Sequence, residues 1–312
     1  MKIRNPYLVS CGGFLLAMGV IACATMNRPF SSNFGTSVPV IMYHRVVPDD
    51  QKVSAVNRQN EVTLYTRSVS EFKKEMAYLA DHGFTPISFY QLTDYLASKD
   101  AKQLPRKPVI ISFDDGSADW FDLVLPILAS DKFKATFFLI TDDESRRQYL
   151  GEDFAPVTWP QVQRIANYRS ETGERLFDIE SHSYTHMDLS ATLLDGSKNG
   201  LPNGQQLADK VAIVREEMAR SMRTIQERTG RRPAFLALPY GAGAWESVPD
   251  SLTFPLIKSI AREIGYLGIR TSRNDIPNNF MTDPYMIGAQ LTMLSITTYE
   301  QFVDRLKPFG LD

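Results

Sequence analysis

Strands and helices alternate about seven times along this chain, and the alternation limits the folds open to it. The predicted strands cover residues 38–43, 84–88, 108–113, 134–140, 176–182, 234–238, 266–270 and 285–291. The run 108–113 lacks the polar alternation of a half-exposed strand, which favours burial on both faces, as in a parallel sheet. The pattern therefore predicts a parallel α/β fold, and 312 residues suit a closed or nearly closed barrel.

Polar residues stand directly after several of these strands. His44, Asp114 and Asp115, the segment 182–186 and Tyr240 all occupy such positions. The carboxyl ends of parallel strands meet at one rim, where the chemistry of such folds takes place. We therefore expect these residues to lie close together.

The sequence Asp114-Asp115-Gly116 closes a buried strand. Successive side chains of a strand point to opposite faces, so both carboxylates reach one site only if the backbone bends there. Gly116 permits such a bend, although the same residues also suit a simple turn. One carboxylate together with His182 and His186 would make a metal triad that leaves room for water.

Composition and spacing disfavour three other classes of protein. A formal net charge of −2 gives no basic field for nucleic acid. A glycoside hydrolase needs carboxyl groups about 5–9.5 Å apart on either side of a bond, which the neighbours Asp114 and Asp115 rarely manage. A zinc protease of the common helical type is disfavoured because no Glu follows His182 as base.

The first residues have the pattern of an export signal. A short basic start with Lys2 and Arg4 precedes an apolar stretch that runs to Ala22. The segment Val-Ile-Ala-Cys resembles a bacterial lipobox, which predicts cleavage before Cys23 and attachment of lipid to it. An ordinary signal peptide with an incidental cysteine is the alternative.

The predicted organisation is a lipoprotein signal peptide over 1–22, a tether over 23–37 and a catalytic domain over 38–312. Because Cys11 and Cys23 are the two cysteines, the mature domain would hold no thiol and no disulfide. We expect an exported protein of the cell envelope, anchored to a membrane by its lipid.

Three motifs in order resemble those of the polysaccharide deacetylases (carbohydrate esterase family four). They are Ser-Phe-Asp-Asp-Gly at 112–116, Ser-His-Ser-Tyr-Thr-His at 181–186 and Leu-Pro-Tyr-Gly at 238–241. The resemblance runs from about residue 38 to residue 306. It implies a distorted (β/α)7 barrel that removes acetyl groups from N-acetylated sugars with a bound divalent metal.

The resemblance also assigns roles by position. Asp115, His182 and His186 would hold the metal, with Zn expected and Fe, Co or Ni as alternatives. Asp114 would be the general base that takes a proton from water. The backbone N–H of Tyr240 would stabilise the oxyanion, together with the metal.

The chain departs from the family pattern at two places. The arginine that usually precedes Pro-Tyr-Gly is replaced by Ala237, and none of the 4 histidines follows His186 to serve as the usual general acid. His44 is left to protonate the leaving amine, with a buried histidine bonded to backbone as the alternative. Arg270 and Arg273 are candidates to replace the missing arginine, although the sequence does not place them.

In these departures and in its early Tyr-His strand end, the chain resembles one subgroup, the exported poly-β-1,6-N-acetylglucosamine N-deacetylases. They imply an enzyme acting on an envelope or biofilm polysaccharide, with polysaccharide export machinery as a partner. A catalytically weak scaffold lipoprotein and a deacetylase of peptidoglycan or chitin-type substrate are the alternatives. The substrate-binding candidates, most of them aromatic residues whose flat faces suit sugar rings, are Trp120, Tyr184, Pro239 and Trp245.

Overall fold

The structure is a computed structural model that describes residues 36–51, 64–196, 200–241, 248–275 and 277–309. The predicted signal peptide, nearly all of the predicted tether, Cys23 and Trp245 lie outside these ranges. Within them, no helix combines the length and the apolar character needed to cross a membrane.

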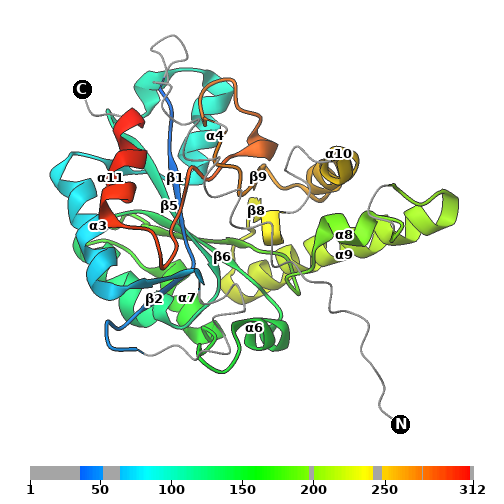
Figure 1. Cartoon of the computed structure of the whole chain (residues 1–312), viewed down its shortest axis with the longest axis horizontal. Helices are drawn as coiled ribbons and strands as arrows, with labels where there is room; N and C mark the ends of the chain where they lie inside the picture. Colours follow the sequence, from blue (N-terminus) through cyan, green and yellow to red (C-terminus); the bar gives the residue numbers. More distant parts are fainter. Residues whose placement is uncertain (1–35, 52–63, 197–199, 242–247, 276, 310–312) are drawn as a thin grey trace. The chain divides into compact units, whose positions relative to one another are not determined.

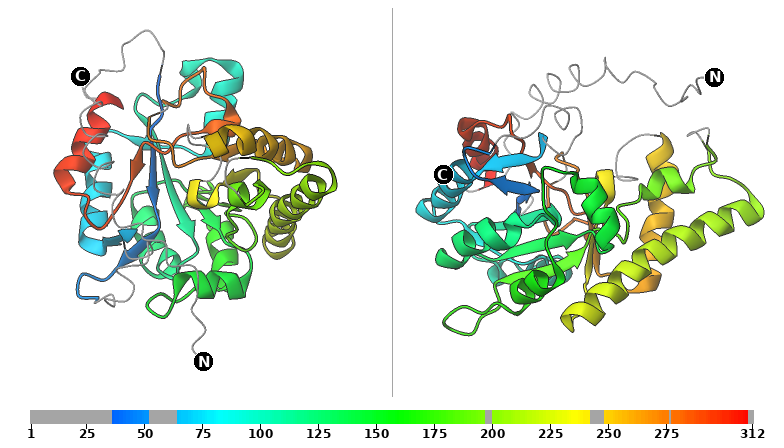
Figure 2. Two further views of the ribbon diagram at one scale, coloured as in Figure 1. Left: turned by 45° about the vertical axis from the view of Figure 1, so that its right-hand side comes forward. Right: turned by 90° about the horizontal axis from the view of Figure 1, so that it is seen from below.

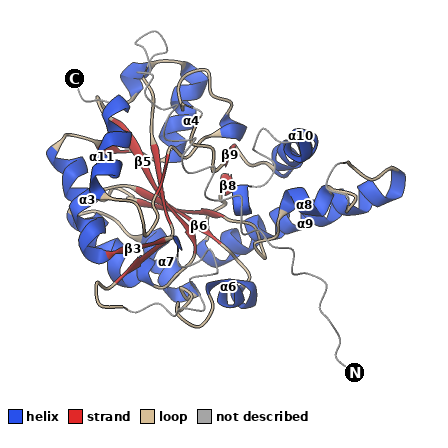
Figure 3. Ribbon diagram, viewed as in Figure 1, coloured by secondary structure: helices blue, strands red, loops and turns tan. Residues whose placement is uncertain are grey.

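One curled parallel sheet forms the centre of the fold (Figure 3). Its strands follow the order β10-β1-β5-β6-β7-β8-β9, and β4 pairs with β5 outside this path. A separate pair is made by β2 and β3. The strands are β1 (Val40–Tyr43), β2 (Arg45–Val47), β3 (Thr66–Ser68), β4 (Thr85–Pro86), β5 (Pro108–Asp115), β6 (Ala135–Leu139), β7 (Phe177–Ser181), β8 (Phe235–Ala237), β9 (Gly268–Arg270) and β10 (Leu291–Thr292).

Helices surround the sheet (Figure 1). They are α3 (Val69–Asp81), α4 (Phe89–Ser98), α5 (Leu125–Ser130), α6 (Asp143–Leu150), α7 (Trp159–Asn167), α8 (Leu189–Leu193), α9 (Gly204–Thr229), α10 (Val248–Ile264) and α11 (Tyr299–Leu306). On one flank α3 and α11 lie together, while α8, α9 and α10 gather on the other flank (Figures 1 and 2).

The sheet is buried on both faces, as the unbroken apolar runs predict. Along β1, Ile41 and Tyr43 pack into the core beneath α3, α7 and α11, whereas Val40 and Met42 face the inside of the curl with α4. Full burial of an aliphatic or aromatic side chain contributes roughly 1.5–3 kcal/mol, so both faces stabilise the sheet. The predicted parallel barrel-type fold is confirmed.

The predicted strand 285–291 is largely wrong. Its first part is a 3-10 turn, Pro284–Met286, because Asp283 Oδ1 accepts a hydrogen bond from the backbone N–H of Tyr285 at 3.0 Å. The chain then bonds to β9 through Ile287 and reaches β1 as the short strand β10. This single segment links the two edge regions of the curled sheet.

Candidate metal and catalytic site

The carboxyl ends of β1, β5 and β7 bring three of the predicted polar groups to the same level. Tyr43 pairs in register with Phe113, so His44 and Asp114 each stand one residue beyond that pair. Asp115 pairs with Leu139, whose carbonyl accepts a hydrogen bond from the N–H of His182 at 2.9 Å. The register therefore gathers residues that lie up to 138 positions apart, from His44 to His182.

The two adjacent carboxylates share one site because the backbone turns sharply at Asp115. Its φ is +81°, and the N–H of Gly116 donates to the carbonyl of Asp114 at 3.2 Å, which closes a three-residue turn. A non-glycine residue in this region costs about 1–3 kcal/mol. Gly116 follows with φ +108°, and a Cβ there would lie 2.6 Å from Leu139 Cδ1. The predicted bend is thus present, but Asp115 carries much of it.

Asp115, His182 and His186 form a buried cluster. Asp115 Oδ1 lies 3.5 Å from His182 Nε2 and 3.8 Å from His186 Nε2. Two ligand atoms at about 2.1 Å from one ion, at a tetrahedral angle, lie roughly 3.4 Å apart. All three residues are buried, and their ligand atoms lie within 4.8 Å of one another.

The hydrogen bonds around His182 fit a bound cation. Its Nδ1 lies 3.0 Å from the carbonyl of Ala237, which can only accept, so Nδ1 carries the proton. A neutral ring then turns the lone pair of Nε2 toward the carboxylate of Asp115. Two acceptors that face each other in a buried site repel unless a cation lies between them, so the residues present suit a divalent metal.

Asp115 also has a cationic partner. Arg45 Nη2 donates to Asp115 Oδ2 at 2.7 Å, and both side chains are almost completely buried. Burial alone would raise the pKa of Asp115, but the Arg45 guanidinium beside it holds this pKa well below its usual range. The carboxylate is therefore ionised at any physiological pH, with Oδ1 facing the two histidines.

Asp114 is held by Arg270. The guanidinium of Arg270 bonds to Asp114 Oδ2 and also contacts the sulfur of Met42. Arg270 on β9 pairs in register with Ala237 on β8, the position where an arginine was expected. Asp114 Oδ1 is buried and has no hydrogen-bond partner among the described residues. This leaves one oxygen of Asp114 for a further partner.

His44 lies beside the carboxylates in a dry environment. Its Nε2 is 3.9 Å from Asp114 Oδ2, and its ring centroid is 4.3 Å from that of Tyr65. Burial lowers the pKa of His44 to about 4, although Asp115 and Asp114 act in the opposite direction. The ring is therefore neutral at neutral pH.

Comparison with known proteins adds to this geometry. A sequence profile described as polysaccharide deacetylase matches residues 101–253, which include Asp114, Asp115, His182 and His186. The chain contains a polysaccharide deacetylase domain. A relative from Staphylococcus epidermidis, named poly-beta-1,6-N-acetyl-D-glucosamine N-deacetylase, is 26% identical over 208 residues. That match spans 66% of this chain and 65% of the relative.

Solved structures share the fold of the deacetylase domain. A de-N-acetylase from Aggregatibacter actinomycetemcomitans superimposes with a TM-score of 0.64 at 22% identity, covering 86% of this chain and 99% of that one. A Streptococcus pyogenes deacetylase in complex with acetate gives 0.61 at 19% identity, covering 86% of this chain and 98% of that one.

One predicted aromatic contact of the deacetylase domain is corrected. Trp120 is completely buried, and its Nε1–H donates to the carbonyl of His44 at 3.2 Å. A covered ring cannot lie against a sugar, so Trp120 positions the backbone of His44 instead. The sequence predicts a surface position because Trp120 closely follows a strand end. Its burial depends instead on the π-helical turn 120–124.

The other substrate-binding candidates have different surroundings. Tyr240 is 52% exposed with φ +57°, and its ring centroid lies 4.6 Å from that of His186. Pro239 beside it is buried. Tyr184 is partly exposed, with the guanidinium of Arg220 4.0 Å from its ring centroid. Of these, Tyr240 offers the most open face next to the cluster.

Sequence reasoning missed two residues of the candidate site. The ring centroid of Tyr149 on α6 lies 4.1 Å from that of His186. The sequence does not predict α6, because this short charged helix has no apolar periodicity. Arg45 could have been found, because a basic residue directly after a buried strand and beside His44 requires a partner. Arg273 pairs with Asp275, so Arg270 alone of the two candidate arginines bonds to Asp114.

Proposed function

We propose that this protein is a metal-dependent N-deacetylase that hydrolyses acetamide groups of an N-acetylglucosamine polysaccharide. One observation carries the proposal: Asp114, with a free buried oxygen and a guanidinium partner, adjoins a cluster that suits a divalent cation. Hydrolysis of an amide needs both an activated water and a base to deprotonate it.

The residues would divide the work as follows. Asp115, His182 and His186 would hold the cation, and the cation would supply Lewis acidity toward water and the acetamide oxygen. Asp114 would accept the proton of the attacking water, and Arg270 would keep its carboxylate oriented. The backbone N–H of Tyr240 would donate to the developing oxyanion, a contact worth about 3 kcal/mol in comparable sites.

His44 would deliver the proton to the leaving amine. Because burial keeps its ring neutral at neutral pH, it cannot store a proton before the reaction. Its Nε2 lies 3.9 Å from Asp114 Oδ2, so a proton that Asp114 has taken from water has a short path to it. His44 would thus be protonated only during turnover.

A relative supports the proposed substrate class. The Staphylococcus epidermidis relative is named for poly-beta-1,6-N-acetyl-D-glucosamine, and we propose a polymer of this kind for the present chain. The exposed ring of Tyr240 and the nearby ring of Tyr149, 6.4 Å apart and edge to face, would border the sugar above the cluster.

The test is release of acetate from N-acetylglucosamine oligomers by the purified full-length chain in detergent. We expect release that a chelator abolishes and that added Zn, Co or Ni restores, with the Asp114→Asn variant as the inactive control. Faster release from β-1,6 than from β-1,4 oligomers would support the proposed polymer, and the reverse would favour a chitin-type or peptidoglycan substrate. If no oligomer releases acetate although the protein holds its full complement of metal, catalysis is refuted and a scaffold role is favoured.

We also propose that Cys23 carries a lipid that anchors the protein in the cell envelope. The residues Val-Ile-Ala before it support this, since such cleavage prefers small residues. Cells fed a labelled fatty acid should label the wild-type chain and not the Cys23→Ser variant. Equal labelling of both would exclude this anchor.

A further inference from the structure

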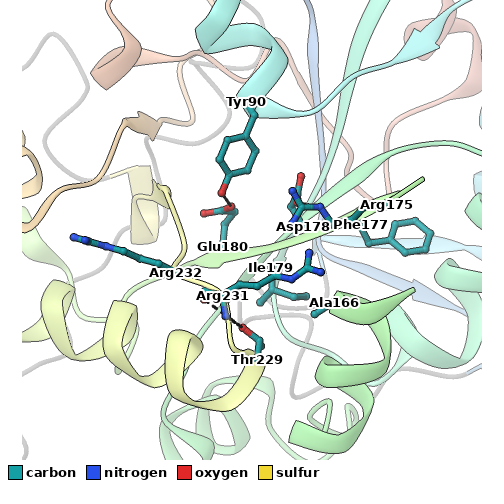
Figure 4. A pocket seen from close by; sticks show the side chains of 10 residues that line it. All are labelled: Tyr90, Ala166, Arg175, Phe177, Asp178, Ile179, Glu180, Thr229, Arg231 and Arg232. Carbon is teal, nitrogen blue, oxygen red and sulfur yellow. Dashed lines mark hydrogen bonds and ion pairs between the residues drawn. The ribbon is translucent and has the colours of Figure 1, made fainter. Parts of the chain in front are cut away.

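A cavity lies away from the metal cluster, between β7, the C-terminal end of α9 and Tyr90 of α4. Its volume is about 240 Å³, and its lining includes Tyr90, Asp178, Glu180, Arg175 and Arg231 (Figure 4). The first four residues of β7 line the cavity, whereas the metal cluster begins after the last residue of β7. Asp178 and His182 are four positions apart, or about 13 Å along a strand. No residue of the proposed catalytic site lines it.

Beside the cavity, β7 and β8 separate. Their ladder contains a single register pair, Ser181 with Leu236. Below that pair, Glu180 Oε2 takes the place of strand carbonyls and accepts the N–H groups of Ala234 and Phe235, both at 2.7 Å. The side chain of Glu180 thus bridges β7 and the start of β8, and it also lines the cavity.

The carboxylates of the cavity already have partners. Glu180 Oε1 accepts from the hydroxyl of Tyr90 at 3.1 Å, which Figure 4 shows reaching down from α4. Asp178 Oδ1 lies 3.2 Å from Arg175 Nε. A cation entering the cavity would find no free carboxylate there.

Three arginines line the cavity, Arg175, Arg231 and Arg232, against the two carboxylates of Asp178 and Glu180. Among the described residues, no carboxylate lies within ion-pair distance of the Arg231 guanidinium. Burial and the nearby cations Arg175 and Arg169 lower the pKa of Arg231, while Asp178 acts in the opposite direction, and the arginine stays charged. Arg232 is directed elsewhere, to the carbonyl of Ile264 at 2.6 Å. The local excess of charge is therefore positive.

We propose that this cavity binds a small organic anion, whose phosphate or carboxylate pairs with Arg231 and Arg175. Guanidinium groups bind both of these anions through paired, charge-assisted hydrogen bonds. The body of the ligand lies between the ring of Tyr90 and Ile179, in a space equal to roughly eight waters of liquid, which suits one sugar ring. The site is distinct from the proposed deacetylase centre and extends beyond that function.

Calorimetric titration of the full-length chain with glucose 6-phosphate tests the proposal, with glucose, glucuronate and inorganic phosphate as comparison probes. We expect one glucose 6-phosphate per chain and binding of glucose at least about tenfold weaker, because the acid group supplies the charged bonds. Glucuronate binding as tightly as the sugar phosphate would identify the acid group in general as the feature recognised.

Variants of Arg231 separate this site from adventitious binding. Arg231→Gln should weaken the binding of glucose 6-phosphate by roughly 10- to 100-fold. Arg231→Lys, which keeps the charge, should lose less affinity. Arg228→Gln removes the same charge from an exposed position of α9 outside the cavity and should bind as the wild type does. Thermal unfolding of each variant shows whether the fold is kept.

Three results would overturn the proposal: no binding of any anion, equal binding of glucose and glucose 6-phosphate, or undiminished binding by a folded Arg231→Gln variant. Acetate release from oligomers is measured on the same samples. Release should be unchanged in Arg231→Gln, so a failure of the anion site is distinguishable from a failure of the deacetylase proposal.

Discussion

Arg270 lies beside Ala237 in adjacent strands, and its guanidinium bonds to the carboxylate of Asp114. The arginine expected at position 237 is thus supplied by the neighbouring strand at the same level. Ala237 leaves space there and still uses its carbonyl to accept from His182 Nδ1. The positive partner of the proposed base is kept although its usual sequence position is empty.

This relationship predicts that the arginine can be moved. Arg270→Ala should lower kcat by about 100-fold, because a small displacement of a catalytic group is enough for such a loss. The double variant Ala237→Arg with Arg270→Ala should recover a substantial part of kcat, as measured by acetate release. Metal content should be equal in all three proteins.

The stability of these variants gives an independent check. Removing one partner of a buried ion pair costs about 3–5 kcal/mol, which urea unfolding of Arg270→Ala should reveal. If the double variant regains stability but no activity, Arg270 serves the fold and not the orientation of Asp114.

Asp114→Asn should lower kcat by about 10²- to 10⁴-fold while the bound metal stays constant, because an amide keeps the shape but accepts no proton. Metal analysis and acetate release on the same preparation measure the two effects. Activity near the wild-type level would remove Asp114 as the base.

His182→Ala should lose both metal and activity, because it removes a proposed ligand and its bond to Ala237. His82→Ala is the matched control. His82 lies at the end of α3, with Nδ1 2.9 Å from the carbonyl of Tyr78, so its loss should leave the metal in place. Undiminished metal in His182→Ala would contradict the proposed ligand set.

His44 should make the metal-free protein sensitive to acid. Its pKa is about 4 when folded and 6.5 when unfolded, so between these values the unfolded state binds more protons. The free energy of unfolding should therefore rise from pH 4 to 6.5, and His44 accounts for about 3 kcal/mol of that rise. Urea unfolding of chelator-treated protein across this range measures it.

The His44→Asn variant provides the comparison. Its stability should depend less steeply on pH in this range, and some slope should remain because burial also lowers the pKa of His186 to about 3. The metal-loaded variant should turn over more slowly with full metal content. If the variant matches the wild type in turnover rate and in the pH dependence of its stability, His44 has neither of the proposed roles.

The sequence predicted the fold because its strands are unbroken apolar runs, and burial on both faces of a parallel sheet requires such runs. It also predicted that one carboxylate of the pair Asp114 and Asp115 would meet His182 and His186, since these residues end or follow strands of that sheet. These inferences depend on local pattern and on the general geometry of parallel sheets. The choice of Asp115 came from the resemblance to the polysaccharide deacetylases.

Other features depend on register and side-chain direction, which local pattern does not carry. Arg270 could not be placed, because its reach to Asp114 depends on how far β9 is shifted along β8. Trp120 was taken for a surface ring, although the turn that follows β5 buries it under His44. The strand predicted over 285–291 begins as a 3-10 turn, because the Asp283 side chain competes for backbone hydrogen bonds.

The two neighbouring carboxylates each have a guanidinium of their own, Arg270 for Asp114 and Arg45 for Asp115. The four side chains therefore sum to zero formal charge, and a dication held among them would keep its whole charge uncancelled. Such a site gives up some affinity for the ion and gains electron-withdrawing power. It should favour a substrate oxygen that becomes negative over one that stays neutral, which selects for the transition state of amide hydrolysis.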